Sequence, residues 1–355
     1  MGGVAKDVEE VKEGINNEVA SFELKGNYRS SQRIIDYYKA FQVNNLEIEA
    51  TGRFKDEQGR IVHNTIVDKS QIEIHISQVI NHYINEEVIR ENEICVLAPA
   101  WWLVAPIGRK LKQLLPDCSF DATGLSPFRR NKDNFWYRVT RLFLIQPSPN
   151  MYVVRYRWAR ELIDELKFAV KGTIPEEYDH PKRMLRLINS ISSEEEDGLL
   201  YLENVFSELM RKLGIDYTAI EYLVSHKNSF FESAKKILES DDYNGIPTNI
   251  QAFRRMFKRR TGIVVNTCHG VKGEEFDLVI SFGNLQGLLP NWQLIFDDDE
   301  DDQEHAKKLL YVVCSRAKRF LHLISEDGRK TKRRNSYNST EVLSALSYDY
   351  NSDIA

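Results

Sequence analysis

Short apolar runs alternate with amphipathic stretches along this sequence, and the alternation limits the folds that the chain can adopt. Buried strands are predicted for EICVLA (93–98), GIVVNT (262–267) and DLVISF (277–282). Further strands are expected at 19–24, 46–51, 60–67 and 320–325, and helices at 30–42, 70–85, 103–115 and 303–315. Strands that alternate with helices are typical of a parallel sheet flanked by helices. The predicted fold class is therefore α/β.

Two of the predicted strands depart from this order. The polar residues Lys55 to Gly59 separate the run at 46–51 from the run at 60–67. A short polar segment with glycine between two strand-like runs indicates a hairpin. We therefore expect these two strands to pair with each other.

The sequence changes character after Ser126-Pro127, because from there to about residue 248 nearly every periodic segment is helical. The expected helices are 135–144, 156–170, 180–191, 198–213 and 229–238. We predict one α/β domain in two portions, an inserted and mainly α-helical domain, and a polar basic tail that is partly frayed. The corresponding boundaries are 1–126 and 251–327 for the α/β domain, 127–250 for the insert and 328–355 for the tail.

Composition excludes several classes of protein. A chain of 355 residues can form two or three domains and bury a core without disulfides or metal. Its net charge of −5 excludes a wholly polycationic nucleic-acid binder. No apolar run reaches the roughly 18 residues of a membrane helix, and the N-terminus lacks a signal pattern. The four cysteines are widely spaced, without metal-binding spacing, which favours a reducing, cytoplasmic setting.

The segment 269–276, HGVKGEEF, combines glycines with opposite charges between two predicted strands. It lies after the carboxyl end of the strand at 262–267, and ligands bind at that edge of open α/β sheets. Gly273 lets the backbone approach a phosphate and Lys272 adds a positive charge. Glu275 could accept hydrogen bonds from a ribose hydroxyl. A tight loop with an internal ion pair is the alternative interpretation.

Two arginines stand beside predicted helix ends. Arg29, in GNYRSS, lies between a strand and a helix, where its guanidinium could bind an anion. Arg316 falls between the last helix and the last strand, where it could stabilise charge on a transferring phosphoryl group. The alternatives are a surface arginine beside a helix capped by Asn27 or Ser30 and a charge favoured by the helix dipole. We expect these charges to gather with those of 269–276 at one edge of the sheet.

In this order the three segments resemble motifs IV, V and VI of the UvrD/Rep family of superfamily 1 DNA helicases. NYRSS resembles motif IV, NTCHGVKGEEF resembles motif V, and LLYVVCSRAK resembles motif VI. The resemblance implies that the α/β part is a second RecA-like domain and that the helical insert is an accessory domain. It also implies an ATP-dependent helicase that moves 3′ to 5′ on DNA.

The resemblance implies roles for individual residues. The nucleotide-binding residues would be Arg29, Lys272, Gly273, Glu275 and Arg316. Arg29 would contact the γ-phosphate and Arg316 would be an arginine finger, so both are candidate catalytic residues. Glu275 would contact the nucleotide sugar. Thr267 and His269 would lie on the path of single-stranded DNA.

The sequence departs from the family after the strand at 93–98. The family has an arginine there, but this chain has Pro99-Ala100-Trp101-Trp102. Trp101 and Trp102 are candidate nucleic-acid-binding residues because aromatic rings stack on bases. Packing in the core or at a domain interface is the competing interpretation and the commoner role of tryptophan. The EGxxP segment of the family reads QGLLP at 286–290.

Two helicase motifs are absent from the sequence: it has neither GxxxxGK[ST] nor an apolar strand that ends in DExx. The resemblance places both in a first RecA-like domain upstream of motif IV, and residues 2–5 resemble the family's segment just past motif III. We therefore expect the chain to be the C-terminal half of a helicase and to hydrolyse no ATP alone. The intact enzyme would use ATP and Mg²⁺, with no metal ligands in this chain.

A second hypothesis is a stand-alone, non-catalytic module that keeps the helicase fold to bind DNA or a partner. The partners expected for the helicase are single-stranded DNA or a single/double-strand junction, and the N-terminal helicase domain.

Basic clusters at 129–132, 254–260 and 329–334 could contact the DNA backbone or form a solvated basic face. The acidic run at 297–302 is interpreted as a solvated loop. The residues alone do not say whether the nucleic acid is DNA or RNA or which pathway uses the enzyme. They also do not give the oligomeric state or the role of the insert.

Overall fold

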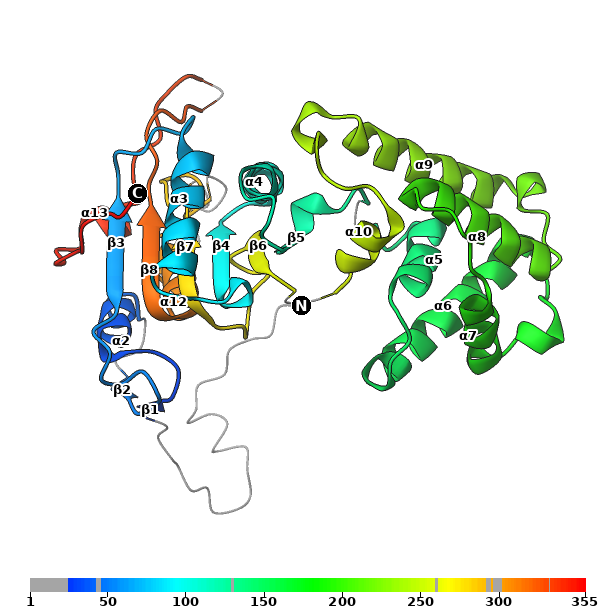
Figure 1. The fold of residues 1–355 in the computed structure, drawn as a ribbon, viewed down its shortest axis with the longest axis horizontal. Coiled ribbons are helices and arrows are strands. Elements are labelled where there is room, and N and C mark those ends of the chain that lie inside the picture. The colour runs from blue at the N-terminus through cyan, green and yellow to red at the C-terminus, as the bar shows by residue number, and fades with distance from the viewer. Residues whose placement is uncertain are drawn as a thin grey trace, which may run out of the picture.

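The α/β part of the protein is built on one parallel sheet (Figure 1). The computed structural model describes residues 25–42, 46–128, 131–258, 261–291, 295, 302–331 and 333–355. Within these residues, six strands lie in the order β3-β8-β7-β4-β6-β5, and all neighbouring strands are parallel. Their bounds are β3 (Arg60–Asn64), β4 (Ile94–Ala98), β5 (Phe120–Ala122), β6 (Ile263–Thr267), β7 (Phe276–Ser281) and β8 (Ala317–Ile324). The predicted α/β class is confirmed.

Helices cover both faces of the sheet, and the central strand β4 has all five residues buried. Cys95 and Leu97 belong to the core beneath α2 (Gln32–Lys39) and α12 (Asp302–Cys314). Val96 belongs to the core beneath α3 (Ile72–Asn85) and α4 (Trp101–Leu114). Alternate residues of a strand face opposite sides, so a nearly continuous apolar run is what a doubly covered strand requires.

The hairpin expectation was wrong. β2 (Glu49–Ala50) pairs in parallel with β1 (Gly26–Asn27), and the two form a small separate sheet. β3 pairs in parallel with β8, whose sequence is more than 250 residues away. The two runs do contain the strands β2 and β3, but the strand that pairs with β3 lies far away in the sequence. Local sequence spacing carries no information about such a distant partner.

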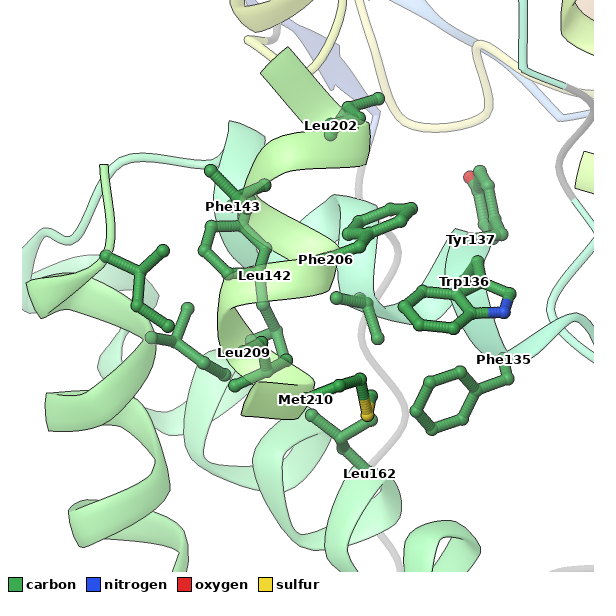
Figure 2. Close-up of a cluster of buried hydrophobic side chains, with 14 of the residues drawn as sticks. Phe135, Trp136, Tyr137, Leu142, Phe143, Leu162, Leu202, Phe206, Leu209 and Met210 are labelled. Atoms are coloured by element: carbon green, nitrogen blue, oxygen red, sulfur yellow. The ribbon is translucent and has the colours of Figure 1, made fainter. Parts of the chain in front are cut away.

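The middle of the chain forms a helical body with its own apolar core, drawn in green in Figure 1. Its helices are α5 (Phe135–Leu144), α6 (Tyr152–Val170), α7 (Pro181–Ser190), α8 (Gly198–Lys212), α9 (Glu221–Leu238) and α10 (Ile250–Arg255). Figure 2 shows Trp136 and Phe206 among the aliphatic side chains of this core. The indole N–H of Trp136 donates to the Leu223 carbonyl at 2.8 Å, which satisfies its polar atom. The division of the chain into the four predicted ranges stays a prediction.

Local details differ from the expected elements. Helix α6 begins at Tyr152 and α9 at Glu221, so each is longer than predicted. The short strand β5 and the helix α10 were not predicted. None of the described helices combines the length and apolar composition that a membrane crossing requires. The strand expected at 19–24, the segment 2–5, acids 297–301 and basic residues 129, 130, 259, 260 and 332 lie outside the described residues.

The C-terminal segment is packed against the sheet, contrary to the expected fraying. The ring of Tyr348 lies edge-on to that of Tyr37 in α2, with 4.8 Å between centroids. Asn351 donates its backbone N–H to the Ile61 carbonyl at 2.8 Å, and its side-chain oxygen accepts from the Ile61 N–H at 2.9 Å. These bonds satisfy the Ile61 N–H and carbonyl at the outer edge of β3. The composition of the segment did not indicate this packing, because the residues that anchor it are separated by polar residues.

Replacing Asn351 with alanine tests this edge contact. The Ile61 N–H would lose its acceptor, so we expect the free energy of unfolding to fall by about 1–3 kcal/mol. Urea denaturation followed by circular dichroism measures the change. Asn228→Ala, on the exposed face of α9, is the matched control and should shift stability by about 0.5 kcal/mol or less. Equal effects of the two substitutions would contradict the packed position of the C-terminal segment.

Candidate functional site

The candidate site residues lie at two opposite edges of the sheet. The carboxyl edge is formed by the ends of the strands, and the amino edge by their beginnings. Thr267 ends β6 at the carboxyl edge, whereas Glu275 and Arg316 directly precede β7 and β8 at the amino edge. The charges of Arg29, Glu275 and Arg316 do share one edge, but it is the amino edge and not the carboxyl edge expected for the segment 269–276, and Lys272 lies apart from them. β6 and β7 are parallel with β4 between them, so residues 268–275 run back along the whole strand length.

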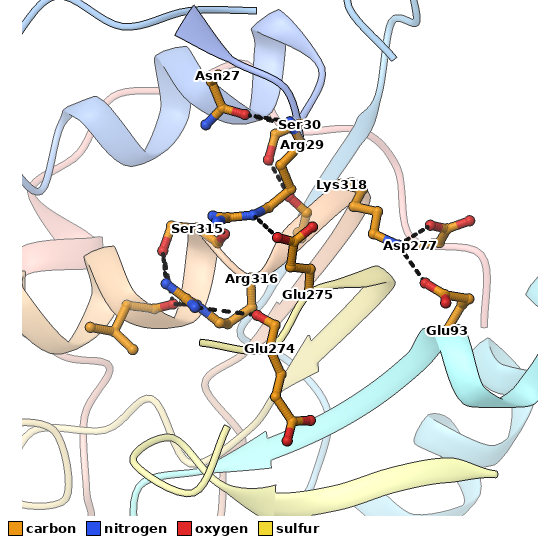
Figure 3. Close-up of polar contacts among 12 residues, drawn as sticks. Asn27, Arg29, Ser30, Glu93, Glu274, Glu275, Asp277, Ser315, Arg316 and Lys318 are labelled. Carbon is orange, nitrogen blue, oxygen red and sulfur yellow. Dashed lines mark hydrogen bonds and ion pairs between the residues drawn. The ribbon is translucent and has the colours of Figure 1, made fainter. Parts of the chain in front are cut away.

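At the amino edge, Arg29 and Arg316 come together with Glu275 (Figure 3). The Arg29 Nε lies 3.1 Å from Glu275 Oε1, and Arg29 Nη1 donates to the Ser315 carbonyl at 2.8 Å. The Arg29 and Glu275 side chains are 28% and 42% exposed, so both remain open to solvent. Two guanidinium groups and one carboxylate thus form a half-exposed charged cluster. Such a cluster can bind a polyanion and a hydroxyl group together.

Arg29 is positioned by the turn between β1 and α2. The Asn27 side-chain oxygen accepts from the backbone N–H groups of Arg29 and Ser30, at 2.8 and 3.0 Å. The Ser30 hydroxyl donates to the Ala317 carbonyl at 2.7 Å, and the Ser31 N–H donates to the Lys318 carbonyl at 2.9 Å. Asn27 therefore holds the turn itself. Ser30 and Ser31 attach the turn to the beginning of β8.

Arg316 is held more tightly than Arg29. Its Nε donates to the Val312 carbonyl at 3.0 Å, its Nη1 to the Glu274 carbonyl at 3.2 Å and its Nη2 to the Ser315 hydroxyl at 3.0 Å. Burial lowers the pKa of Arg316, and the positive charge of Arg29 lowers it further. The same environment, with two cations close together, favours an anion between them.

Lys318 adds a charge network beside this cluster that sequence reasoning missed. Its Nζ lies 2.5 Å from Glu93 Oε2 and 3.2 Å from Asp277 Oδ1. Arg319 also pairs with Asp277, at 3.3 Å. The sequence provided only a weak indication of this charge network, because its residues lie at or beside the ends of the predicted strands and belong to no recognised motif. The network fixes the beginnings of β4, β7 and β8 relative to one another.

Lys272 and Gly273 lie between the two edges, in the connection from β6 to β7. Both are exposed. Gly273 has a φ of +85°, which favours glycine, and no atom would lie within 4 Å of an added Cβ. Lys272 forms no ion pair within the part of the chain that the structure describes. These two residues are therefore accessible but stand apart from the arginine cluster.

At the carboxyl edge, a tight turn begins at Thr267, contains His269 and ends at Gly270. The Thr267 carbonyl accepts from the Gly270 N–H at 2.9 Å, and its hydroxyl accepts from the same N–H at 3.2 Å. His269 is exposed. An added Cβ on Gly270 would lie 2.3 Å from the Asn266 side chain, so the turn needs glycine there.

Trp101 and Trp102 lie on the surface of the same edge. They open α4, three and four residues after the end of β4, and their side chains are 50% and 55% exposed. The competing interpretation was packing in the core or at a domain interface, and the core half of it is contradicted by this exposure. Ala98 of β4 pairs with Thr267 of β6, so the tryptophans and Thr267 follow adjacent strand ends. No group of metal-ligating side chains is found within the described residues.

Comparison with known proteins agrees with this architecture. Residues 217–328 match the family model of the UvrD-like helicase C-terminal domain. The match includes β6, β7, α12 and β8, and therefore the segments of Glu275 and Arg316. This part of the chain is therefore similar to the C-terminal domain of UvrD-like helicases. The family resemblance deduced from the motifs is confirmed.

Individual relatives match part of the chain. A probable DNA helicase II homolog of Mycoplasma genitalium is 32% identical over 123 residues, 34% of this chain and 17% of the relative. DNA helicase II of Rickettsia typhi is 24% identical over 173 residues, 49% of this chain and 22% of the relative. The ATP-dependent DNA helicase Rep of Buchnera aphidicola is 27% identical over 127 residues, 33% of this chain and 19% of the relative. The matched part of the chain thus spans about a fifth of each relative.

The surface position of the two tryptophans has a consequence for stability. We expect Trp101→Ala and Trp102→Ala each to lower the free energy of unfolding by about 1 kcal/mol or less, because both rings are half exposed. Trp136→Ala removes a fully buried ring and should cost about 3–5 kcal/mol. Chemical denaturation of the three variants measures the difference. A large loss for Trp101→Ala or Trp102→Ala would mean that the ring packs in the core.

Proposed function

We propose that this chain provides the second RecA-like domain and the helical insert of an ATP-dependent DNA helicase or translocase that moves 3′ to 5′. The observation that carries the proposal is the meeting of Arg29, Glu275 and Arg316 at the amino edge. Segments 286 residues apart in the sequence are joined there by the bond from Arg29 to the Ser315 carbonyl. The domain boundaries predicted from the sequence belong to this proposal.

The nucleotide would bind at the amino edge, against a first RecA-like domain that carries the Walker A sequence and the Mg²⁺ ligands. ATP supplies the phosphoryl group that is transferred to water. Arg29 and Arg316 would bind the γ-phosphate and stabilise the charge that develops on it. To do so, Arg29 would exchange its ion pair with Glu275 for the phosphate. Glu275 would then be released to accept a hydrogen bond from the ribose.

Single-stranded DNA would bind at the carboxyl edge, near Thr267 and His269, with Trp101 and Trp102 as stacking surfaces. β6 has five residues, so at about 3.3 Å per residue the two edges lie roughly 16 Å apart. The connection 268–275 begins at the DNA edge and ends at the nucleotide edge. A shift of Glu275 on nucleotide binding would therefore act on a loop whose other end lies at the DNA edge.

The second candidate function is a non-catalytic module that uses the carboxyl edge to bind DNA or a partner. It needs no anion site at the amino edge. The half-exposed pair of Arg29 and Glu275, beside a second arginine, favours the helicase. The two functions predict different effects of an Arg316 substitution on ATP hydrolysis.

We expect the chain alone to hydrolyse no ATP. Combined with the Walker A-bearing RecA-like domain, as one polypeptide or as a second chain, it should support DNA-stimulated hydrolysis. Arg316→Ala should then lower kcat by about 10³-fold or more, as expected for an arginine finger. Arg316→Lys should restore little activity, because lysine lacks the planar fork. Steady-state ATPase measurements with single-stranded DNA test this.

Arg211→Ala provides the control, because Arg211 lies exposed on α8 in the insert. It should leave kcat and the KM for ATP unchanged. ATP hydrolysis by the chain alone, or full activity of Arg316→Ala in the combined protein, would refute the shared nucleotide site. DNA binding without any hydrolysis in the combined protein would favour the non-catalytic module.

The DNA edge is tested by His269→Ala. We expect the Kd for a single-stranded oligonucleotide to rise several-fold, because a stacked base contributes about 1–3 kcal/mol. Fluorescence anisotropy of the chain with a labelled oligothymidylate measures this Kd. His180→Ala replaces another exposed histidine, at the start of α7 in the insert, and should change nothing. Equal affinities of both variants and the wild type would remove His269 from the DNA path.

A further inference from the structure

A buried carboxylate lies at the carboxyl edge, just beyond the end of β8. The Glu326 side chain is fully buried. Its Oε2 accepts from the Gly283 N–H at 2.8 Å, and its Oε1 accepts from Arg329 Nε at 2.8 Å. Arg329 Nη2 lies 2.8 Å from the same Oε1. The guanidinium of Arg329 is therefore fixed by two contacts to one buried oxygen.

This fixed guanidinium lies next to an exposed tryptophan. The guanidinium carbon of Arg329 is 5.8 Å from the ring centroid of Trp102, within cation–π range. The Trp102 side chain is 55% exposed, so much of its surface is open. Arg329 Nη1 donates no hydrogen bond within the described residues, which leaves donors for a further acceptor. An open indole beside a fixed, partly free guanidinium can bind a base and a phosphate together.

The backbone around this pair holds it at the strand ends. Gly283 follows β7 and has a φ of +71°, which favours glycine. An added Cβ there would lie 3.1 Å from the Leu103 side chain of α4 and 3.4 Å from Pro99. The turn that presents the Gly283 N–H to Glu326 is thus packed directly against the beginning of α4. Trp102 is a residue of that same first turn.

The strand order places Arg329 at the same edge as Trp102. Arg329 brings a guanidinium to the same edge from the end of β8, two strands away in the sheet. The adjacent strands β8, β7, β4 and β6 end at this edge, so the candidate contacts Arg329, Trp102 and Thr267 lie along one row of strand ends.

We propose that Trp102 and Arg329 bind one nucleotide of a single strand, with the base stacked on the indole and the adjoining phosphate on the guanidinium. Glu326 is the positioning residue that holds Arg329 beside the ring. This inference rests on the proposed function, because it assumes that single-stranded DNA crosses the carboxyl edge. It adds a contact to the one at Thr267 and His269.

The test uses the full chain and a labelled oligothymidylate of about 16 nucleotides, titrated at several salt concentrations. Trp102→Ala should weaken binding about 5- to 150-fold, the equivalent of one lost stacking contact. Arg329→Ala should weaken binding and lower the slope of log K against log salt by about 0.7, since one phosphate contact is lost. Arg329→Lys should keep the slope but recover only part of the affinity.

Glu326→Gln separates positioning from simple charge neutralisation. The substitution makes the chain more positive by one charge, so a carboxylate that only neutralised Arg329 would predict tighter binding. A positioning role predicts weaker binding and less quenching of tryptophan fluorescence by the DNA. Glu165→Gln is the matched control, because Glu165 is a largely buried carboxylate paired with Arg138 at 2.9 Å in the insert. It should change neither affinity nor quenching.

The outcomes are distinguishable. Absence of binding by the wild-type chain would overturn the DNA edge of the proposed function and this inference with it. Wild-type binding that Trp102→Ala and Arg329→Ala leave unchanged would overturn only this inference. Tighter binding by Glu326→Gln would remove the positioning role. Should circular dichroism show that Glu326→Gln is unfolded, the comparison of Arg329→Lys with Arg329→Ala decides the role of the guanidinium.

Discussion

The insertion of β4 between β6 and β7 is the constraint on which the functional geometry depends. Because the three strands are parallel, the chain that leaves β6 at the carboxyl edge must enter β7 at the amino edge. Residues 268–275 make this return without a helix. One short loop therefore has His269 at one edge of the sheet and Glu275 at the other. In the proposed function, a coupling between DNA and nucleotide would use this connection, which the strand order provides.

A second constraint is that the sheet is built from strands on both sides of the helical insert. β3, β4 and β5 precede the helical insert, whereas β6, β7 and β8 come after it, so the sheet forms only when the insert returns the chain to its starting point. The attachment of Ser30 and Ser31 to the beginning of β8 then sets Arg29 beside Arg316. The local sequence around Arg29 or Arg316 does not determine that the two side chains lie together. Their meeting is a property of the whole α/β domain.

The sequence predicted the elements better than their partners. Strands β4, β6 and β7 were found because their apolar runs are long enough to be buried on both faces, and this identified the α/β class. The pairing of β3 with β8 could not be found, since hydrogen bonds between backbones leave no local pattern. Motif segments pointed to Arg29, Glu275 and Arg316, but not to the edge that they share. Trp101 and Trp102 were ambiguous because tryptophan is common both in cores and on binding surfaces. Glu326 went unnoticed because nothing in its sequence context signals a buried carboxylate.

The two charged pairs at the two edges differ in a way that matches different tasks. Arg29 and Glu275 are both substantially exposed, so their attraction is worth about 1 kcal/mol or less. A triphosphate could replace Glu275 at little cost, which suits a site that binds and releases its ligand in every cycle. Glu326 is fully buried, and removing one partner of such a pair costs about 3–5 kcal/mol. Separating Arg329 from Glu326 is therefore costly. The Arg329 guanidinium is a fixed part of the carboxyl edge, whereas the Arg29 guanidinium at the amino edge can exchange its partner, as the proposed nucleotide site requires.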